Sequence, residues 1–198
     1  MVLFQKKPYF ILMKRLFDLI LCVILLLILV IPMLLIALSI AISSEGPILY
    51  WSNRVGRRNI IFKMPKFRTM KINTPSLPSH LMQNPEEYLT PIGIFLRRYS
   101  MDELPQLFSI LIGDMSFVGP RPALFNQDDL ISLRTKHNID SLIPGLTGWA
   151  QVNGRDQISI AEKVRFDLEY LKKKSFTFDL KIFWMTFFKV LGSSNVSH

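Results

Sequence analysis

Two adjacent carboxylates, Asp102 and Glu103, are the residues whose types and spacing most directly suggest chemistry. They follow Arg97 by five residues and precede the segment Gly119-Pro120-Arg121-Pro122. A carboxylate can attack phosphorus or bind a metal ion, while a guanidinium group binds phosphoryl oxygens in a bidentate manner. Prolines on both sides of Arg121 restrict its backbone and favour its use as a ligand. Because a long apolar segment lies upstream, the pattern indicates phosphate chemistry at a membrane surface.

A structural role explains half of this pair. Ser100 and Glu103 have the spacing of a capping box, in which both side chains satisfy backbone donors at a helix start. Apolar residues at helical spacing then predict a helix from Ser100 to Gly113. Asp102 is not needed by that motif, and a helix N-terminus would favour its ionised form. The pattern alone therefore leaves catalysis by Asp102 and capping by Glu103 both open.

The segment from Leu19 to Ile42 contains 24 residues without a charge. As a helix it would be about 36 Å long, against a hydrocarbon core of roughly 30 Å, so it predicts membrane residence. Pro32 lies near its middle and predicts a kink, because proline removes a backbone donor and clashes with the preceding turn. The apolar run is too long for a typical signal peptide and lacks a convincing cleavage site.

The positive charge is concentrated around this segment. Residues 1–71 contain 11 Lys and Arg against 2 Asp and Glu, whereas residues 72–198 contain 13 of each. Basic residues on both flanks favour the cytoplasmic side for both ends, which a bent, re-entrant helix satisfies better than a straight span. An ordinary proline-containing span remains the alternative. Balanced charge on the remainder argues against nucleic acid as a partner and favours anionic lipid.

The rest of the chain predicts one globular unit of mixed composition. Residues 46–51 and 60–62 predict a small β-hairpin around a turn at residues 55–59, and residues 160–174 predict a charged helix. Near the C-terminus, apolar residues recur at helical spacing and predict an amphipathic helix that packs on the core, lies in the membrane interface, or does both: Leu180, Phe183, Trp184, Phe187, Phe188 and Leu191. Cys22 is the single cysteine, so no intrachain disulfide or Cys-based zinc site can form.

Several longer motifs follow one another over nearly the whole chain: Lys14-Arg15-x-Phe17-Asp18, Gly46-Pro47, Lys66-Phe67-Arg68-Thr69-Met70, Asp102-Glu103-Leu104-Pro105-Gln106-Leu107, Gly113-Asp114-Met115-Ser116-Phe117-Val118-Gly119-Pro120-Arg121-Pro122 and Pro144-Gly145-Leu146-Thr147-Gly148-Trp149-Ala150-Gln151-Val152-Asn153-Gly154-Arg155. In this order they resemble the bacterial sugar transferases, also called small monotopic phosphoglycosyl transferases. Many members place serine before the helix-breaking proline, where this chain has Ile31, and Ile160 stands where an aromatic residue is common.

The resemblance implies transfer of a sugar 1-phosphate from a UDP-sugar to undecaprenyl (polyprenyl) phosphate, with release of UMP, to initiate a cell-surface glycan. It implies Asp102 as the nucleophile, through a covalent phosphosugar-aspartyl intermediate, and Glu103 with Asp102 as ligands of Mg²⁺. The further residues that match family positions near phosphate are Arg97, Arg121, Arg155, Lys66 and Arg68.

The expected fold is therefore mixed α/β and helix-dominated, in a monotopic membrane protein with amphipathic interfacial helices. Residues 1–45 would form the re-entrant anchor, broken at Pro32, and residues 46–198 the catalytic domain at the cytoplasmic face of the bacterial inner membrane. The expected partners are the UDP-sugar, the lipid phosphate and the phospholipid membrane, and a homodimer is left open. The alternative from another class is a catalytically inactive membrane adaptor in a glycan assembly complex.

Overall fold

The computed structural model describes residues 8–72, 74, 84–154 and 157–192. The described part is helix-dominated with a few short strands, in agreement with the expected class. Its helices and 3₁₀ turns are α1 (Pro8–Ser43), η1 (Arg57–Asn59), η3 (Pro85–Tyr88), α2 (Pro91–Arg98), η4 (Met101–Glu103), α3 (Gln106–Ile112), α4 (Asp128–Lys136), η5 (Ile139–Ser141), α5 (Trp149–Val152), α6 (Ile160–Lys173) and α7 (Phe176–Gly192). Its strands are β1 (Leu49–Val55), β2 (Ile61–Phe67), β3 (Ser116–Val118), β4 (Ala123–Leu124) and β5 (Gly145–Thr147).

The predicted hairpin is confirmed, and both of its strands are longer than expected. β1 pairs antiparallel with β2 on one side and with β4 on the other, so β1 is the central strand. Ser52 and Arg54 lie on the same face as Lys66, because directly paired residues of antiparallel strands share a face and Tyr50 pairs with Lys66. Ser52 and Arg54 made the second half of β1 hard to predict as a strand from the sequence. Both residues face the side of the sheet on which Lys66 lies.

A second sheet joins two short segments that are distant in the sequence. β3 and β5 pair in parallel, with Ser116 opposite Gly145 and Val118 opposite Thr147. The pairing continues past the strands, since the Gly119 amide donates to the Thr147 carbonyl at 2.8 Å. A Cβ at Gly119 would lie 2.4 Å from the Ile143 carbonyl oxygen, so only glycine permits this approach. The motif at residues 113–122 is thereby held against the motif at residues 144–155.

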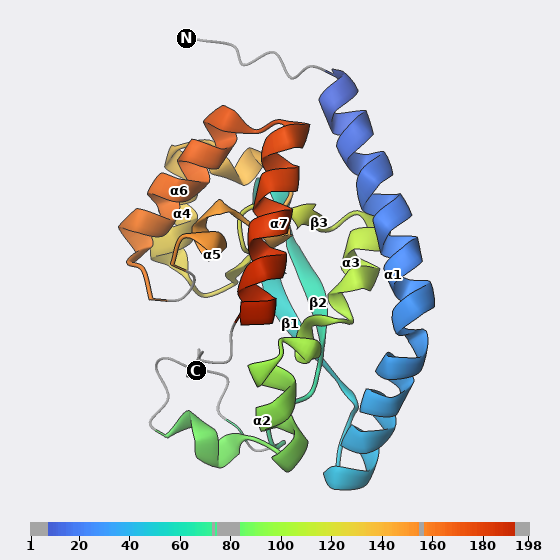
Figure 1. The fold of residues 1–198 in the computed structure, drawn as a ribbon. Coiled ribbons are helices and arrows are strands. Elements are labelled where there is room, and N and C mark those ends of the chain that lie inside the picture. The colour runs from blue at the N-terminus through green and yellow to red at the C-terminus, as the bar shows by residue number, and fades with distance from the viewer. Residues whose placement is uncertain (1–7, 73, 75–83, 155–156, 193–198) are drawn as a thin grey trace.

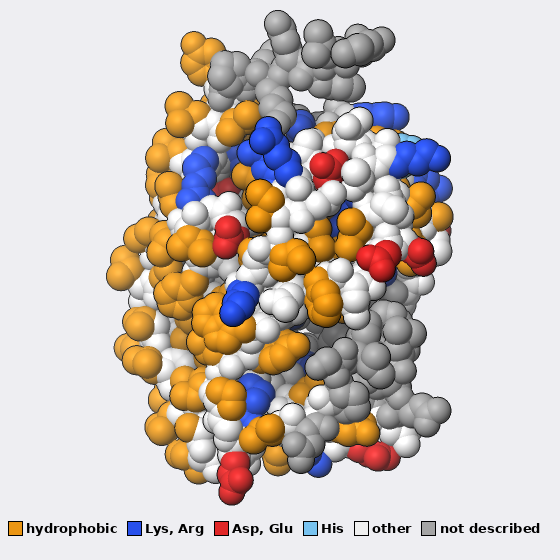
Figure 2. Space-filling model, turned by 180° about the vertical axis from the view of Figure 1, so that it is seen from behind, with side chains coloured by type: hydrophobic (Ala, Val, Ile, Leu, Met, Phe, Trp, Pro, Cys, Tyr) orange, Lys and Arg blue, Asp and Glu red, His pale blue; other side chains and the backbone are white. Residues whose placement is uncertain are grey.

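The apolar segment forms the single long helix α1, which runs along one side of the molecule and bends along its length (Figure 1). The helix continues through Pro32, so the predicted break does not interrupt it. One stripe of α1 packs on the domain over most of its length, and its members recur every three or four residues: Asp18, Cys22, Leu25, Leu29, Met33, Ile36 and Ile40. Only 11% of its most apolar window is buried, unlike the core helix of a soluble protein. Hydrophobic side chains therefore gather along this edge of the surface (Figure 2).

Three charged residues of α1 attach the helix to the domain. Arg15 donates to the Ile110 and Leu111 carbonyls at 2.6 and 2.8 Å, which satisfies acceptors at the C-terminal end of α3. Lys14 pairs with Asp179 of α7 at 2.6 Å and also donates to the Val118 carbonyl at 2.8 Å. Asp18 is buried and accepts the Phe117 amide at 3.2 Å. The motif Lys14-Arg15-x-x-Asp18 thus holds the start of α1 against α3, β3 and α7.

We expect Asp18→Ala to lower the free energy of unfolding by about 1–3 kcal/mol, because the Phe117 amide would remain buried without this acceptor. At about 2–4 °C per kcal/mol for a chain of this size, the thermal midpoint in detergent should fall by several degrees. Leu16→Ala is the matched control, since Leu16 lies on the same turn of α1 and is 57% exposed. Equal midpoints for the two variants would refute an anchoring role for Asp18.

The C-terminal helix α7 packs on the core, but the residues on its packed face differ from those predicted. Ile182 is fully buried and Asp179 accepts a hydrogen bond from the Tyr170 hydroxyl at 2.7 Å, whereas Trp184, Phe187 and Phe188 are 56%, 48% and 65% exposed. Phe183 contacts Phe17 of α1 and Phe117 of β3 edge to face. Core packing is therefore confirmed for α7, and three of the four aromatic residues on the predicted face stay outside the core.

Candidate active site

The acidic pair lies in the 3₁₀ turn η4, between α2 and α3. The predicted capping box is wrong, because Ser100 has a left-handed backbone (φ 54°) and makes no capping hydrogen bond, and α3 begins only at Gln106. The predicted helix end at Gly113 is confirmed, with Gly113 in the left-handed region that glycine favours. A capping box does form at the start of α6, between Ser159 and Glu162. Glu103 is consequently available for other contacts.

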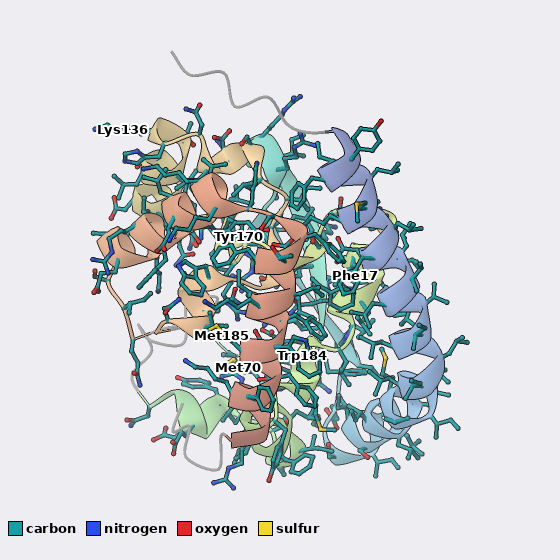
Figure 3. All side chains as sticks on the ribbon, turned by 45° about the horizontal axis from the view of Figure 1, so that its top comes forward. Phe17, Met70, Lys136, Tyr170, Trp184 and Met185 are labelled. Atoms are coloured by element: carbon teal, nitrogen blue, oxygen red, sulfur yellow. The ribbon has the colours of Figure 1, made fainter. Side chains whose placement is uncertain are left out.

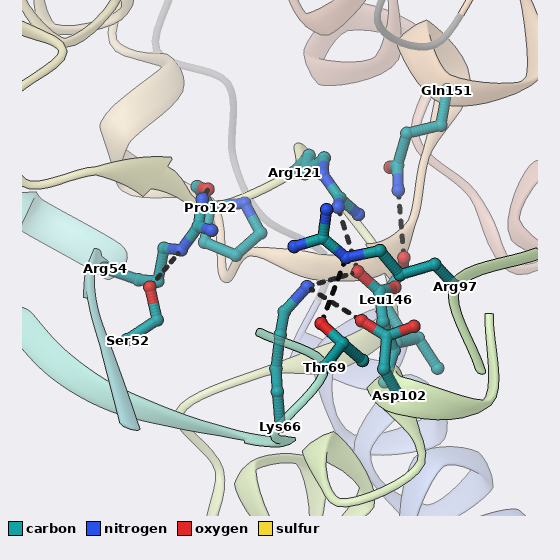
Figure 4. Close-up of polar contacts among 11 residues, drawn as sticks. Ser52, Arg54, Lys66, Thr69, Arg97, Asp102, Arg121, Pro122, Leu146 and Gln151 are labelled. Atoms are coloured by element: carbon teal, nitrogen blue, oxygen red, sulfur yellow. Dashed lines mark hydrogen bonds and ion pairs between the residues drawn. The ribbon is translucent and has the colours of Figure 1, made fainter. Parts of the chain in front are cut away.

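Glu103 lies between two cations. Its Oε1 atom accepts Lys66 Nζ at 2.7 Å and Arg121 Nη2 at 2.9 Å. Lys66 Nζ also lies 3.9 Å from Asp102 Oδ2, so one lysine at the end of β2 faces both carboxylates (Figure 4). Asp102 is 9% exposed. Segments far apart in the sequence, β2, η4 and the loop after β3, thus meet at one cluster of charges.

Arg97 joins this cluster from the last turn of α2. Its Nε donates to Thr69 Oγ1 at 3.0 Å. Burial lowers the pKa of Arg97, and the negative charge of Asp102 opposes that shift. Thr69 is itself held by the turn before α2, because its carbonyl accepts the Thr90 amide at 2.9 Å. Figure 4 shows Arg97, Arg121 and Lys66 around Asp102. The structure therefore brings together five of the residues singled out in the sequence.

The two carboxyl groups have opposite pKa shifts. Burial acts to raise the pKa of Glu103, but the charges of Arg121 and Lys66 and their hydrogen bonds outweigh it and hold that pKa well below its usual range. Burial raises the pKa of Asp102, the charge of Lys66 opposes this, and the charge of Glu103 adds to it. Glu103 is thus a firmly ionised carboxylate that compensates two cations. The Asp102 side chain is about as exposed as that of Glu103, 12% against 14%, but its raised pKa makes it the more basic of the two carboxylates.

One predicted phosphate ligand, Arg68, lies outside this cluster. Arg68 is buried, and its guanidinium group donates to the main-chain oxygens of Ser44 at 2.9 Å, Glu45, and Pro47 at 2.7 Å. Its contacts are with the C-terminal end of α1, where carbonyl groups lack helical partners. Arg68 therefore joins the end of α1 to the end of β2, and it was predicted as a ligand because it belongs to the same motif as Lys66. Arg155 lies outside the described residues.

Sequence reasoning missed several residues that support the cluster. Arg54 of β1 donates to Ser52 Oγ at 3.0 Å and to the Pro122 carbonyl at 3.2 Å, next to Arg121 (Figure 4). Gln151 of α5 donates to the Leu146 carbonyl at 2.9 Å in the same view. Asn53 lies between Ser52 and Arg54, so no alternation of polar and apolar residues marked this part of the strand. No local signal related Thr69 to Arg97.

The fold and the site define a class: a small α/β protein on a long, mostly exposed apolar helix, with an acidic pair among lysine and arginine side chains. Within the described residues no group of three or more His, Cys, Asp or Glu side chains is placed to hold a metal ion by itself. Comparison with known proteins gives the particular family. The bacterial sugar transferase family matches residues 9–193, and the chain belongs to that family.

Among curated relatives, UDP-glucose:undecaprenyl-phosphate glucose-1-phosphate transferase of Escherichia coli (strain K12) is 39% identical over 90% of this chain and 40% of its own length. Undecaprenyl-phosphate galactose phosphotransferase of Salmonella typhimurium is 34% identical over 88% of this chain and 39% of its own length. The uncharacterized sugar transferase EpsL of Bacillus subtilis (strain 168) is 38% identical over 93% of this chain and 90% of its own length. The chain thus spans about two fifths of the first two relatives and most of the third.

Proposed function

We propose that this protein transfers a sugar 1-phosphate from a UDP-sugar to undecaprenyl phosphate and releases UMP. The observation that supports this most strongly is the placement of Asp102 and Glu103 beside Lys66, Arg97 and Arg121. A diphosphate donor and a lipid phosphate are both anionic, so their reaction needs fixed cations as well as a nucleophile. The names of the relatives, which are transferases acting on undecaprenyl phosphate, are consistent with this chemistry.

In the first step, an Asp102 carboxylate oxygen attacks the sugar-linked phosphorus of the donor. A new P–O bond forms to Asp102 as the bond from that phosphorus to the bridging oxygen of the diphosphate breaks, and UMP leaves with that oxygen and the electron pair. In the second step, a phosphate oxygen of the lipid attacks the same phosphorus and displaces Asp102, which is regenerated as a carboxylate. Arg97 and Arg121 would bind the phosphoryl oxygens, and Lys66 would offset charge beside both carboxylates.

We propose Mg²⁺ as the cofactor, held by Glu103 and Asp102. The donor set fits, because Mg²⁺ typically takes one or two carboxylates and completes its shell with substrate phosphates and water. Two carboxylates from the protein are therefore enough for this assignment. Among the described residues Lys66 and Arg121 both contact Glu103 Oε1, and in this assignment the second carboxylate oxygen of Glu103 would bind the ion. When bound, the ion would neutralise negative charge on the donor diphosphate.

We further propose a monotopic protein at the cytoplasmic face of the bacterial inner membrane, where it initiates a cell-surface glycan. The stripe of α1 that packs on the domain from Asp18 to Ile40 supports this, because a helix crossing the bilayer clear of its domain would have no such stripe. Both ends of α1 remain next to the domain, at Lys14 and at Ser44. The exposed aromatic face of α7 would lie in the membrane interface.

UMP release from a panel of UDP-sugars, assayed with undecaprenyl phosphate and Mg²⁺, tests the function and identifies the sugar. We expect one donor, or a small set of related donors, to yield UMP and a lipid-linked sugar phosphate. Purified protein that releases no UMP with any donor, although it is folded, would refute the enzyme and favour the inactive adaptor.

The membrane placement of α7 is tested by spin labels at Phe188→Cys and Lys136→Cys, each in a Cys22→Ser background. Lys136 is the control because it lies on the side of the molecule remote from Trp184 (Figure 3). In lipid nanodiscs we expect the label at position 188 to be more accessible to oxygen than to a water-soluble nickel complex, and the label at position 136 to show the reverse. A label at position 188 with the water-exposed signature of position 136 would contradict the interfacial assignment.

A further inference from the structure

A buried ion pair outside the charged cluster contacts the backbone of Arg121. Arg134 of α4 binds Asp167 of α6 through two nitrogens, with Nε at 3.0 Å and Nη2 at 2.7 Å from Asp167 Oδ2. The remaining nitrogen, Nη1, donates to the main-chain carbonyl of Arg121 at 2.8 Å. The side chains of Arg134 and Asp167 are 12% and 1% exposed. One guanidinium group thus joins α4, α6 and the loop that presents Arg121.

This pair is poorly explained by stability alone. A buried ion pair often contributes no more than apolar residues of similar volume, because both charges lose their hydration. Burial raises the pKa of Asp167, and the charge and hydrogen bonds of Arg134 oppose that shift. The pair does provide geometry: with Nε and Nη2 both directed at one carboxylate, the plane of the guanidinium group is set and Nη1 points at the Arg121 carbonyl.

The loop that carries Arg121 is also bound at the residues on both sides of it. Arg54 donates to the Pro122 carbonyl at 3.2 Å, and the Gly145 amide donates to the Pro120 carbonyl at 2.9 Å. Three consecutive carbonyl groups, those of Pro120, Arg121 and Pro122, are therefore bound by the surrounding structure. Prolines on both sides of Arg121 restrict the backbone further. This arrangement fixes the position from which the Arg121 side chain reaches Glu103 at 2.9 Å.

We propose that Arg134, oriented by Asp167, is a positioning residue that sets the place of Arg121 in the transfer reaction. The inference rests on the proposed function, in which Arg121 binds phosphoryl oxygens. Arg134 itself does not contact the reacting groups in this proposal and acts through the Arg121 backbone. A misplacement of about 1 Å in a catalytic group can cost roughly a hundredfold in rate, so a backbone contact of this kind is sufficient to affect turnover.

Arg134→Lys and Asp167→Asn test the proposal. Lysine keeps the charge but cannot bind Asp167 through two nitrogens while donating to the Arg121 carbonyl, and asparagine keeps the shape of Asp167 without its charge. We expect each variant to lower kcat for UMP release about tenfold. Val164→Ala is the matched control, because Val164 lies on α6 three residues before Asp167 and its apolar side chain packs in the neighbouring core cluster without donating a hydrogen bond to the Arg121 carbonyl. It should lower the thermal midpoint to a similar extent and leave kcat unchanged.

A double-mutant cycle with Arg121→Ala separates positioning from general destabilisation. Arg134→Lys should have little further effect on kcat once the Arg121 side chain is removed. An equal tenfold loss in both backgrounds would overturn the proposal, as would an equal loss for Val164→Ala.

Hydrogen exchange of residues 119–124 provides a readout that does not depend on the donor. Arg134→Lys should speed exchange there relative to both wild type and Val164→Ala, and unchanged exchange would overturn the positioning role. Absence of UMP release from the wild-type protein would instead refute the proposed function, while the exchange result would still decide whether Arg134 orders this loop.

Discussion

Asp102→Asn should lower UMP release by at least about a thousandfold, because the amide has the shape of the carboxylate without its nucleophilic charge. The loss should be accompanied by the disappearance of a covalent adduct. Wild-type protein incubated with donor and Mg²⁺, without lipid acceptor, should gain the mass of the sugar phosphate in intact-protein mass spectrometry. The variant should show no gain.

The control for this prediction is Asp128→Asn, which removes an exposed carboxylate at the start of α4. It makes the same chemical change and should retain both turnover and adduct. Adduct formation by Asp102→Asn at the wild-type rate would show that another residue is the nucleophile. Loss of turnover in both variants would indicate a nonspecific effect on the fold.

Glu103→Gln should lower UMP release by about a hundredfold to a thousandfold, the range for loss of one preorganised electrostatic group. The Glu103 carboxylate compensates Lys66 and Arg121, so its neutralisation leaves two cations close together with less negative charge between them. If Glu103 is also a metal ligand, the Mg²⁺ concentration for half-maximal UMP release should rise. The measurement is a Mg²⁺ titration of the rate for both proteins.

Thermal unfolding of Glu103→Gln separates the structural contribution from the catalytic one. We expect a lower midpoint than for Glu86→Gln, since Glu86 is an exposed residue of η3. An unchanged Mg²⁺ requirement together with reduced activity would remove Glu103 from the metal site. Its role would then be limited to holding Lys66 and Arg121 in place.

Local patterns predicted much of the secondary structure. The helical spacing of apolar residues indicated the long N-terminal helix, α6 and α7, and the glycine-containing turn after Val55 indicated the hairpin. The errors arose where a tertiary contact overrode a local preference. Ser100 and Glu103 match a capping box, but Glu103 forms ion pairs with residues of β2 and of the loop after β3. Strand β1 extends to Val55 because it is paired on both sides, which composition does not show.

The sequence predicted which residues belong to the candidate site, but not how they are arranged in space. Asp102, Glu103, Arg97, Arg121 and Lys66 were selected by motif, and the structure brings them together. Arg68 was selected with them, yet it lies just past the end of β2, and its guanidinium group contacts the main chain at the end of α1. Arg54 and Arg134 were missed, because their partners are backbone carbonyls of a loop 68 and 13 residues away.

The sequence by itself determined the apolar helix, the charge asymmetry around it, the family and the identity of the acidic pair, because hydropathy, charge and contiguous motifs are local properties of the chain. Only the tertiary structure decided which cations face the pair, why the two carboxyl groups differ in pKa, and which buried arginine holds the Arg121 loop. Those features depend on distances and burial between segments that are remote in sequence. Electrostatic interaction and desolvation act through space, so no local pattern specifies them.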